Sequence, residues 1–169
     1  LYDLPGLKPI ISIGRNYPFN ESYSHVLGYV AYASKEDLSA SEIIRERHVP
    51  GLRVGKNGLE KTFENELIGT NTIQRFEVNA YGKRINQLEI QNGDQGNSLR
   101  ITIDTVIQKY TNELLSGEAG SISVMDIYTG DIIAMNSSPS FNPNDFLYGI
   151  GQKEWKDLNS NPFKPLINK

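Results

Sequence analysis

The chain has 169 residues, of which 38% are hydrophobic and 22% are charged, a composition ordinary for a globular protein. Seventeen basic and twenty acidic residues give a net charge of −3. This argues against a nucleic-acid-binding protein, because such proteins usually carry a basic face. Cysteine is absent, which excludes a disulfide framework and a thiolate metal site. No apolar run approaches the ~18 residues of a membrane-spanning helix.

The first 33 residues are predicted to be mainly extended. Several prolines disfavour a helix here, and the isoleucines of residues 10–13 suit a strand. Pro18 holds Tyr17 in an extended conformation, because a proline ring clashes with a helical residue before it. Residues 25–32 are predicted to form a further strand.

Two residue patterns in this strand and in the segment after it predict local structure. Gly28 would permit a close backbone approach or a bulge within the strand. Ser34, followed three residues later by Asp37, resembles a helix N-cap and predicts a short helix over residues 35–39. Residues 41–47 are predicted to add another turn or two of helix.

Residues 54–69 are predicted to contain the helix around which the chain is organised. Its apolar side chains recur at helical spacing and would line one buried face: Leu59, Phe63 and Leu67. Gly58 stands at the expected start, and Gly69 follows the expected end, where a left-handed cap needs no Cβ. Glu60 and Glu64 form a second row on this helix.

Two interpretations of these carboxylates remain open. They form the solvated acidic face of a structural helix, or Arg15 forms an ion pair with Glu60 or Glu64. The planar guanidinium suits bidentate carboxylate binding, and such a pair would tie the first strand region to the helix. The alternative for Arg15 is a solvated charge.

Polar and apolar residues alternate over residues 74–80, which predicts a half-buried strand, followed by a return strand over residues 85–88. Residues 91–97 are the most loop-like in the sequence, so the domain boundary is placed there. The prediction is therefore a unit of residues 1–96 and a second unit of residues 97–169.

The second unit is predicted to begin with a strand over residues 99–103. Asp104 is a good N-cap for a helix over residues 105–115, whose apolar stripe would be Ile107, Tyr110 and Leu114. A hairpin of residues 122–127 and 131–135 follows, with Gly130 in its turn, and is apolar enough to be buried on both faces. A short helix is expected near residues 153–158.

The histidines and tyrosines have mainly structural interpretations. His25 and His48 lie in a strand pattern and a proline-bounded loop, so structural roles are favoured over a catalytic triad. Five tyrosines could form an interaction surface, although packing with a solvated hydroxyl is the more usual arrangement: Tyr17, Tyr23, Tyr29, Tyr32 and Tyr81.

Several separated motifs, taken in order, resemble the class B penicillin-binding proteins, and among them the elongation-specific branch, penicillin-binding protein 2. These are Arg15-Asn16-Tyr17-Pro18, His25 to Val30 around Gly28, Gly58-Leu59-Glu60 through Gly69, Glu77-Val78-Asn79, residues 99–104, residues 125–135 and Pro139 to Lys169. The resemblance covers nearly the whole chain. It implies an α+β fold: an elongated, β-rich pedestal with short helices, then the first strand, helix and hairpin of a transpeptidase-type sheet.

The same resemblance carries expectations about function. The segment would be a non-catalytic scaffold of a peptidoglycan D,D-transpeptidase that acts in cell-wall elongation and cell shape. Its partners would be a second copy or other elongation-complex proteins, namely a SEDS-type glycan polymerase and a rod-shape scaffold protein. The parent protein would bind peptidoglycan stem peptides and β-lactams, in the periplasm, anchored in the inner membrane by a helix before Leu1.

The catalytic motifs of the family are not found in this sequence. No serine is followed by lysine three positions later, Ser-x-Asn occurs only as a coincidence of spacing, and Lys61-Thr62 precedes Phe63 instead of glycine. We therefore predict no catalytic residue, cofactor or metal ligand in this chain. A self-sufficient serine hydrolase with an unrecognised site and a generic periplasmic binding module remain the alternatives. The isolated hairpin would expose unpaired edges, which predicts dimerisation, local disorder or completion by another polypeptide.

Overall fold

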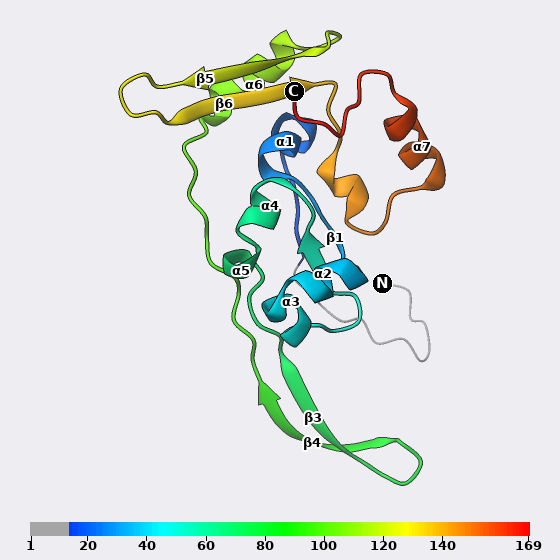
Figure 1. Cartoon of the computed structure of the whole chain (residues 1–169). Helices are drawn as coiled ribbons and strands as arrows, with labels where there is room; N and C mark the ends of the chain where they lie inside the picture. The colour runs from blue at the N-terminus through cyan, green and yellow to red at the C-terminus, as the bar shows by residue number, and fades with distance from the viewer. Residues whose placement is uncertain (1–13) are drawn as a thin grey trace, which may run out of the picture.

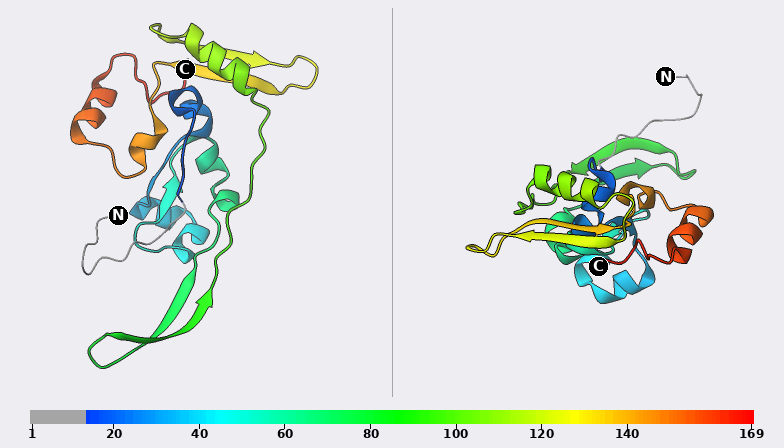
Figure 2. Two further views of the ribbon diagram at one scale, coloured as in Figure 1. Left: turned by 180° about the vertical axis from the view of Figure 1, so that it is seen from behind. Right: turned by 90° about the horizontal axis from the view of Figure 1, so that it is seen from above.

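The computed structural model describes residues 14–169, so the strand predicted at residues 10–13 lies outside the described residues. The molecule is elongated (Figure 1). A central body of residues 14–67 carries a hairpin arm, residues 73–91, at one end, and a C-terminal part, residues 104–169, at the other. A connecting segment, residues 92–103, runs along the length of the molecule between the arm and the C-terminal part (Figure 2).

The body is a small α+β unit of short elements. In chain order they are η1 (Asn20–Tyr23), α1 (Ser24–Leu27), β1 (Val30–Tyr32), α2 (Lys35–Ala40), α3 (Glu42–Glu46), β2 (Arg53–Gly55), α4 (Gly58–Thr62) and α5 (Glu64–Leu67). Strands β1 and β2 pair antiparallel, with Ala31 opposite Val54. Val30 and Val54 are buried, so this two-stranded sheet contributes to the core of the body.

The strand predicted over residues 25–32 is wrong in its first half, where residues 25–27 belong to α1 instead. The short helix turns Ser24 and Val26 inward, and both are buried. An apolar pattern of four residues does not distinguish a helical turn from a strand, and the tertiary contacts decide. Gly28 ends the helix at φ +79°, and β1 begins two residues later.

The serine caps of the next two helices confirm the predicted helices at residues 35–39 and 41–47. The Ser34 hydroxyl accepts from the Asp37 N–H at 3.3 Å, and the Asp37 carboxylate accepts from the Ser34 N–H at 2.7 Å. This reciprocal pair satisfies two backbone donors that a helix start leaves free. The Ser41 hydroxyl caps α3 in the same way, accepting from the Ile44 N–H.

The helix predicted over residues 59–67 exists as two pieces, because Phe63 leaves helical geometry at φ −109°, ψ 26° and separates α4 from α5. Its apolar side chains are half-buried, so the predicted buried face is only partly covered. Leu59 and Leu67 instead line a groove of about 430 Å³ whose opposite wall includes Leu99 and Ile101 of the connecting segment.

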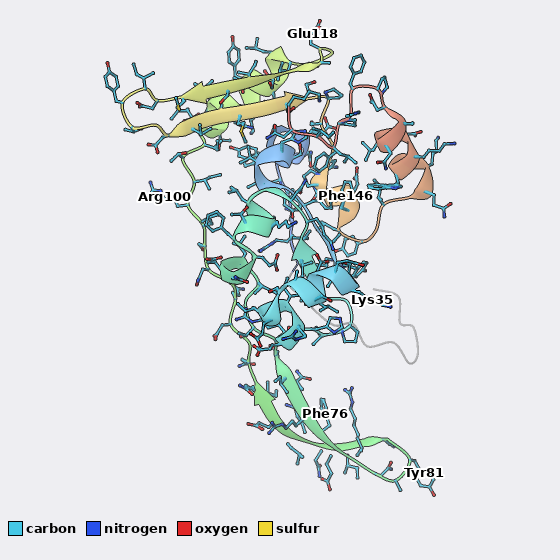
Figure 3. All side chains as sticks on the ribbon, in the orientation of Figure 1. Lys35, Phe76, Tyr81, Arg100, Glu118 and Phe146 are labelled. Carbon is cyan, nitrogen blue, oxygen red and sulfur yellow. The ribbon has the colours of Figure 1, made fainter. Side chains whose placement is uncertain are left out.

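The arm is an antiparallel ribbon of β3 (Ile73–Val78) and β4 (Arg84–Gln91). Figure 3 shows Phe76 and Tyr81 on this ribbon, away from the body. The prediction of a half-buried strand over residues 74–80 is wrong, because every residue of β3 except the half-buried Phe76 is exposed; every residue of β4 is exposed as well. Pairs within the ribbon stabilise it, including Arg84 over the Phe76 ring at 4.3 Å.

The strand predicted over residues 99–103 does not form a backbone ladder. Two bonds tie its end to β6 (Ile132–Ser138): Thr102 Oγ1 donates to the Ile132 carbonyl at 2.7 Å, and the Asp104 N–H donates to the Ile133 carbonyl at 2.8 Å. A side-chain hydroxyl supplies one of these bonds, so the segment lies beside the sheet without the regular pairing of a strand.

Helix α6 (Thr105–Leu114) begins at the predicted cap, since the Asp104 carboxylate accepts from the Val106 and Ile107 N–H groups at 2.8 and 2.9 Å. Its orientation differs from the prediction. The predicted apolar stripe is exposed, with Ile107, Tyr110 and Leu114 at 37%, 60% and 56%. The buried face consists of Gln108, Thr111 and Leu115. Polar side chains bury here because they form hydrogen bonds with β6.

The predicted hairpin is confirmed as β5 (Gly120–Met125) and β6, joined by a turn in which Gly130 has φ +79°. Burial on both faces is not observed, because β5 alternates between half-buried and exposed residues and α6 covers only one face. The chain continues through η2 (Pro143–Phe146) to α7 (Gln152–Ser160), which confirms the predicted C-terminal helix.

Candidate functional site

The buried carboxylate of Glu60 is the centre of the most constrained polar cluster in the body. Only 7% of this residue is exposed. The Tyr17 hydroxyl donates to Oε1 at 3.1 Å, and Arg15 Nε donates to Oε2 at 3.2 Å. Arg15 also donates through Nη2 to the Leu67 carbonyl at 3.3 Å. The structure therefore places Arg15 and Tyr17, from the segment before η1, against α4 and the end of α5.

Glu64 occupies a different environment from Glu60, although the helical spacing predicts one row. Its carboxylate accepts the Gly55 N–H, so it binds the end of β2 and not Arg15. Burial raises the pKa of Glu64 above its usual value, against the lowering effect of the Gly55 donor. Neither carboxylate belongs to a solvated acidic face, so that interpretation of the helix is wrong.

The electrostatics around Tyr17 oppose ionisation. Burial and the nearby Glu60 carboxylate both raise the pKa of the Tyr17 phenol. A neutral phenol that donates to a carboxylate is a stabilising contact, and it offers no base at neutral pH. The cluster is chemically suited to hold two segments together.

Gly28 and Gly58 allow the backbone after α1 to contact the start of α4. A Cβ on Gly28 would lie 2.0 Å from the Asn57 carbonyl oxygen, and a Cβ on Gly58 would lie 2.6 Å from the Gly28 nitrogen. Both residues also have positive φ, +79° and +58°. The Asn57 side chain completes this contact by accepting the Tyr29 N–H at 3.1 Å.

His25 is half-buried at the junction of the body with the C-terminal part. Its ring packs edge-on against Phe141, with centroids 5.4 Å apart. Its Nε2 is buried and has no hydrogen-bond partner within residues 14–169. Burial, together with the Lys169 cation, lowers the pKa of His25 to about 4, so the imidazole is neutral at physiological pH. His48 is exposed on the loop after α3.

The other residues singled out from the sequence lie at element ends and turns. Pro18 is exposed beside the buried Tyr17, Gly69 follows α5 at φ +64°, Asp104 caps α6, and the Gly130 N–H donates to the Asp126 carbonyl at 2.9 Å. The five tyrosines divide: Tyr17 and Tyr23 are buried, Tyr29 is half-buried, and Tyr32 and Tyr81 are exposed. These positions fix the chain path and do not converge on one pocket.

Sequence reasoning missed three amides that join the body to the C-terminal part or organise that part. Gln108 and Asn136 are buried, and the Asn144 side chain reaches the backbone of Tyr17. No sequence signal distinguishes them, because their partners lie far away in the chain. No group of three or more acidic or histidine side chains in residues 14–169 is placed to hold a metal ion. No helix in that range is long and apolar enough to cross a membrane.

Comparison with known proteins identifies the family. The model of the penicillin-binding protein dimerisation domain matches residues 1–101. The chain belongs to this family. The chain is 33% identical over 168 residues to the peptidoglycan D,D-transpeptidase MrdA of Acinetobacter baumannii, covering 99% of this chain and 25% of the relative. The MrdA of Escherichia coli K12 is 31% identical over 170 residues, covering 99% and 27%.

Solved structures show the same arrangement. The complex between PBP2 and MreC from Helicobacter pylori superposes on this penicillin-binding protein segment with a TM-score of 0.73 at 35% identity, covering 90% of this chain and 28% of that one. Pseudomonas aeruginosa PBP2 in complex with WCK 5153 gives 0.72 at 30% identity, covering 90% and 30%. These matches confirm the predicted α+β pedestal fold. The chain spans about a quarter of the length of the relatives.

Proposed function

We propose that this chain is the non-catalytic scaffold of a penicillin-binding protein 2-type peptidoglycan D,D-transpeptidase, which acts in cell-wall elongation and cell-shape maintenance. The proposal rests mainly on the match of residues 1–101 to a penicillin-binding protein dimerisation domain. In addition, almost the whole of this chain aligns to a part of MrdA. The geometry supports it, because the buried polar residues of the Glu60 cluster hold backbone segments together.

We also propose that the chain consists of two units. Residues 1–96 form the pedestal, and residues 97–169 form the beginning of the transpeptidase domain. The nucleophile, its lysine base and the oxyanion donors would come from polypeptide after Lys169. Acyl transfer requires all three in one site, so this segment alone should not react. The parent would bind stem peptides and β-lactams in the periplasm, with its anchor in the inner membrane.

The pedestal is the proposed docking part of the protein. One structural neighbour is a complex of PBP2 with MreC, which supports a rod-shape scaffold protein as partner. The matching family is a dimerisation domain, which supports a second copy. A SEDS-type glycan polymerase is the further proposed partner of the parent protein.

Isothermal titration of the folded chain with the soluble part of MreC from the same organism tests the docking role. We expect saturable binding that does not require a β-lactam-reactive serine. Sedimentation of the chain alone measures self-association separately. A folded, monomeric chain that binds no MreC at the highest soluble concentration would contradict the proposed scaffold function.

A further inference from the structure

One buried amide joins three elements at the junction of the body and the C-terminal part. Gln108 is fully buried. Its Nε2 donates to the Ser22 carbonyl at 2.6 Å and lies 2.9 Å from the Met135 carbonyl, while its Oε1 accepts the Met135 N–H at 2.8 Å. The side chain therefore connects η1 of the body with α6, on which it stands, and with β6.

A second amide makes the corresponding link near the start of the body. The Asn144 side chain accepts the Tyr17 N–H at 3.0 Å through Oδ1 and donates to the Tyr17 carbonyl at 2.9 Å through Nδ2. It also donates to Asn20 Oδ1 at 3.1 Å. Asn144 belongs to the η2 helix of the C-terminal part. Its side chain pairs with both the N–H and the carbonyl of Tyr17, as the backbone of a neighbouring strand would.

Ring contacts contribute to the apolar packing at this junction. Tyr29 and His25 of the body pack against Phe141 edge-on, and Tyr29 also contacts Phe146 at 4.1 Å between centroids. Burial of apolar surface is non-directional, so such rings tolerate small rotations of one part against the other. Hydrogen bonds require aligned donors and acceptors, so Gln108 and Asn144 restrict those rotations.

The fit of these amides argues for a role in orientation. The Gln108 oxygen and the Met135 and Ser22 groups are all satisfied, and the neighbouring Asn136 Nδ2 donates to the Gln108 carbonyl at 2.7 Å and to Thr111 Oγ1 at 2.6 Å. A fully satisfied buried polar network specifies one arrangement, because any shift leaves polar groups unpaired. An apolar side chain of the same size would fill the space without this requirement.

We propose that Gln108 and Asn144 form an orientation clamp, which sets the angle between the body and the C-terminal part. Opening the clamp frees the α6 and β5–β6 unit to rock on the ring contacts of Tyr29, His25 and Phe141. This role concerns the geometry of the chain itself, and it holds whether or not the proposed scaffold function is correct.

The absence of cysteine from the sequence allows a direct test. Spin labels are attached at Ala40→Cys on α2 and Val106→Cys on α6, both exposed positions. Pulsed electron paramagnetic resonance then measures the distance distribution between the two parts. We expect one narrow distribution for the labelled chain, and a broadened or shifted one for Gln108→Leu and for Asn144→Ala. Gln152→Leu, an exposed glutamine on α7, is the matched control and should leave the distribution unchanged.

Circular dichroism separates a change of angle from a loss of fold. The clamp is supported if each variant that keeps native secondary structure, Asn144→Ala in particular, shows a broadened or shifted distance distribution. Asn144→Ala removes a half-buried side chain, so it reports on the clamp even where Gln108→Leu does not fold. A folded Asn144→Ala chain with the same narrow distribution as the unsubstituted chain would overturn the proposal.

Discussion

The Tyr17 hydroxyl donates a hydrogen bond to the Glu60 carboxylate at 3.1 Å, across 43 residues of sequence, and Arg15 forms an ion pair with the same carboxylate. The side chain of Glu60 is 9% exposed, whereas that of Arg15 is 40% exposed. The solvent exposure of this ion pair is therefore intermediate between that of a buried pair and that of a surface pair. Its main consequence is that the segment before η1 is attached to α4.

Arg15→Ala should destabilise the chain by about 2–3 kcal/mol, because it leaves a buried carboxylate with only the Tyr17 donor. The value lies below that of a fully buried pair, since water reaches the guanidinium. Urea unfolding measures the difference. Arg45→Ala is the control, because Arg45 pairs with Glu42 on the surface of α3, and its loss should cost about 0–0.5 kcal/mol. Equal stability of the Arg15 variant and the unsubstituted chain would remove the structural role of this pair.

Gly28→Ala should be among the most destabilising single substitutions in the body. The added Cβ would meet the Asn57 carbonyl carbon at 2.5 Å as well as its oxygen, in a backbone conformation that L-residues seldom adopt. We expect a loss of more than about 3 kcal/mol or failure to fold. Gly82 has a similar φ of +75°, and a Cβ added there would meet nothing in residues 14–169 within 4 Å. Gly82→Ala therefore measures the backbone strain alone, about 1–2 kcal/mol. If the two variants unfold at the same urea concentration, the close contact with Asn57 is not important.

The half-buried His25 predicts a pH dependence of stability. Its pKa is lowered from 6.5 to about 4, so between these values the unfolded chain binds a proton that the folded chain does not. Stability from this residue is fully present above pH 6.5 and falls as the pH is lowered towards 4. We expect a loss of about 1–2 kcal/mol, less than the full shift implies, because the ring is not completely enclosed.

The measurement compares urea unfolding of the unsubstituted chain and His25→Phe at about pH 7.5 and about pH 5, on either side of the ordinary histidine pKa. Phenylalanine keeps the edge-on contact with Phe141 but cannot take up a proton. Both chains retain Lys169 and Glu64, so their contributions cancel in the comparison. An unsubstituted chain whose pH dependence matches that of the phenylalanine variant would show that the pKa of His25 is not lowered by its surroundings.

The uncovered face of α6 predicts association of the isolated chain. Ile107, Tyr110 and Leu114 are all exposed on that face, and β5 has a free edge within the described part of the chain. We expect concentration-dependent sedimentation or weak amide protection over residues 121–135, since exposed edges and apolar faces attract other chains. Tyr110→Lys should reduce the association. A compact monomer with strongly protected amides throughout residues 121–135 would contradict this expectation.

Local chemistry explains which parts of the fold could be predicted from the sequence. The Ser34 and Asp104 caps and the turn at Gly130 depend on residues within a few positions of each other, so the pattern contains the information. The orientation of α6 could not be predicted in this way. Its apolar stripe predicts the wrong buried face, because Gln108 finds its partners on η1 and β6, far away in the sequence.

In the candidate site, too, some features could be predicted from the sequence and others could not. Residue type alone identifies Arg15, Glu60 and Glu64 as a candidate cluster, but only the structure separates Glu60, which binds Arg15, from Glu64, which binds Gly55. The break at Phe63 makes this separation, and nothing in the helical spacing indicates it. Asn144 has no local signal at all, because its partner lies 127 residues earlier.

Incubation of the purified 169-residue chain with a fluorescent penicillin tests whether the chain is non-catalytic, with a full-length MrdA relative as the positive control. We predict labelling of the relative and no covalent adduct on this chain, because no serine in the sequence is followed by lysine three positions later. A stable adduct on any serine of the folded chain, detected by mass spectrometry, would contradict this prediction and favour a self-sufficient serine hydrolase.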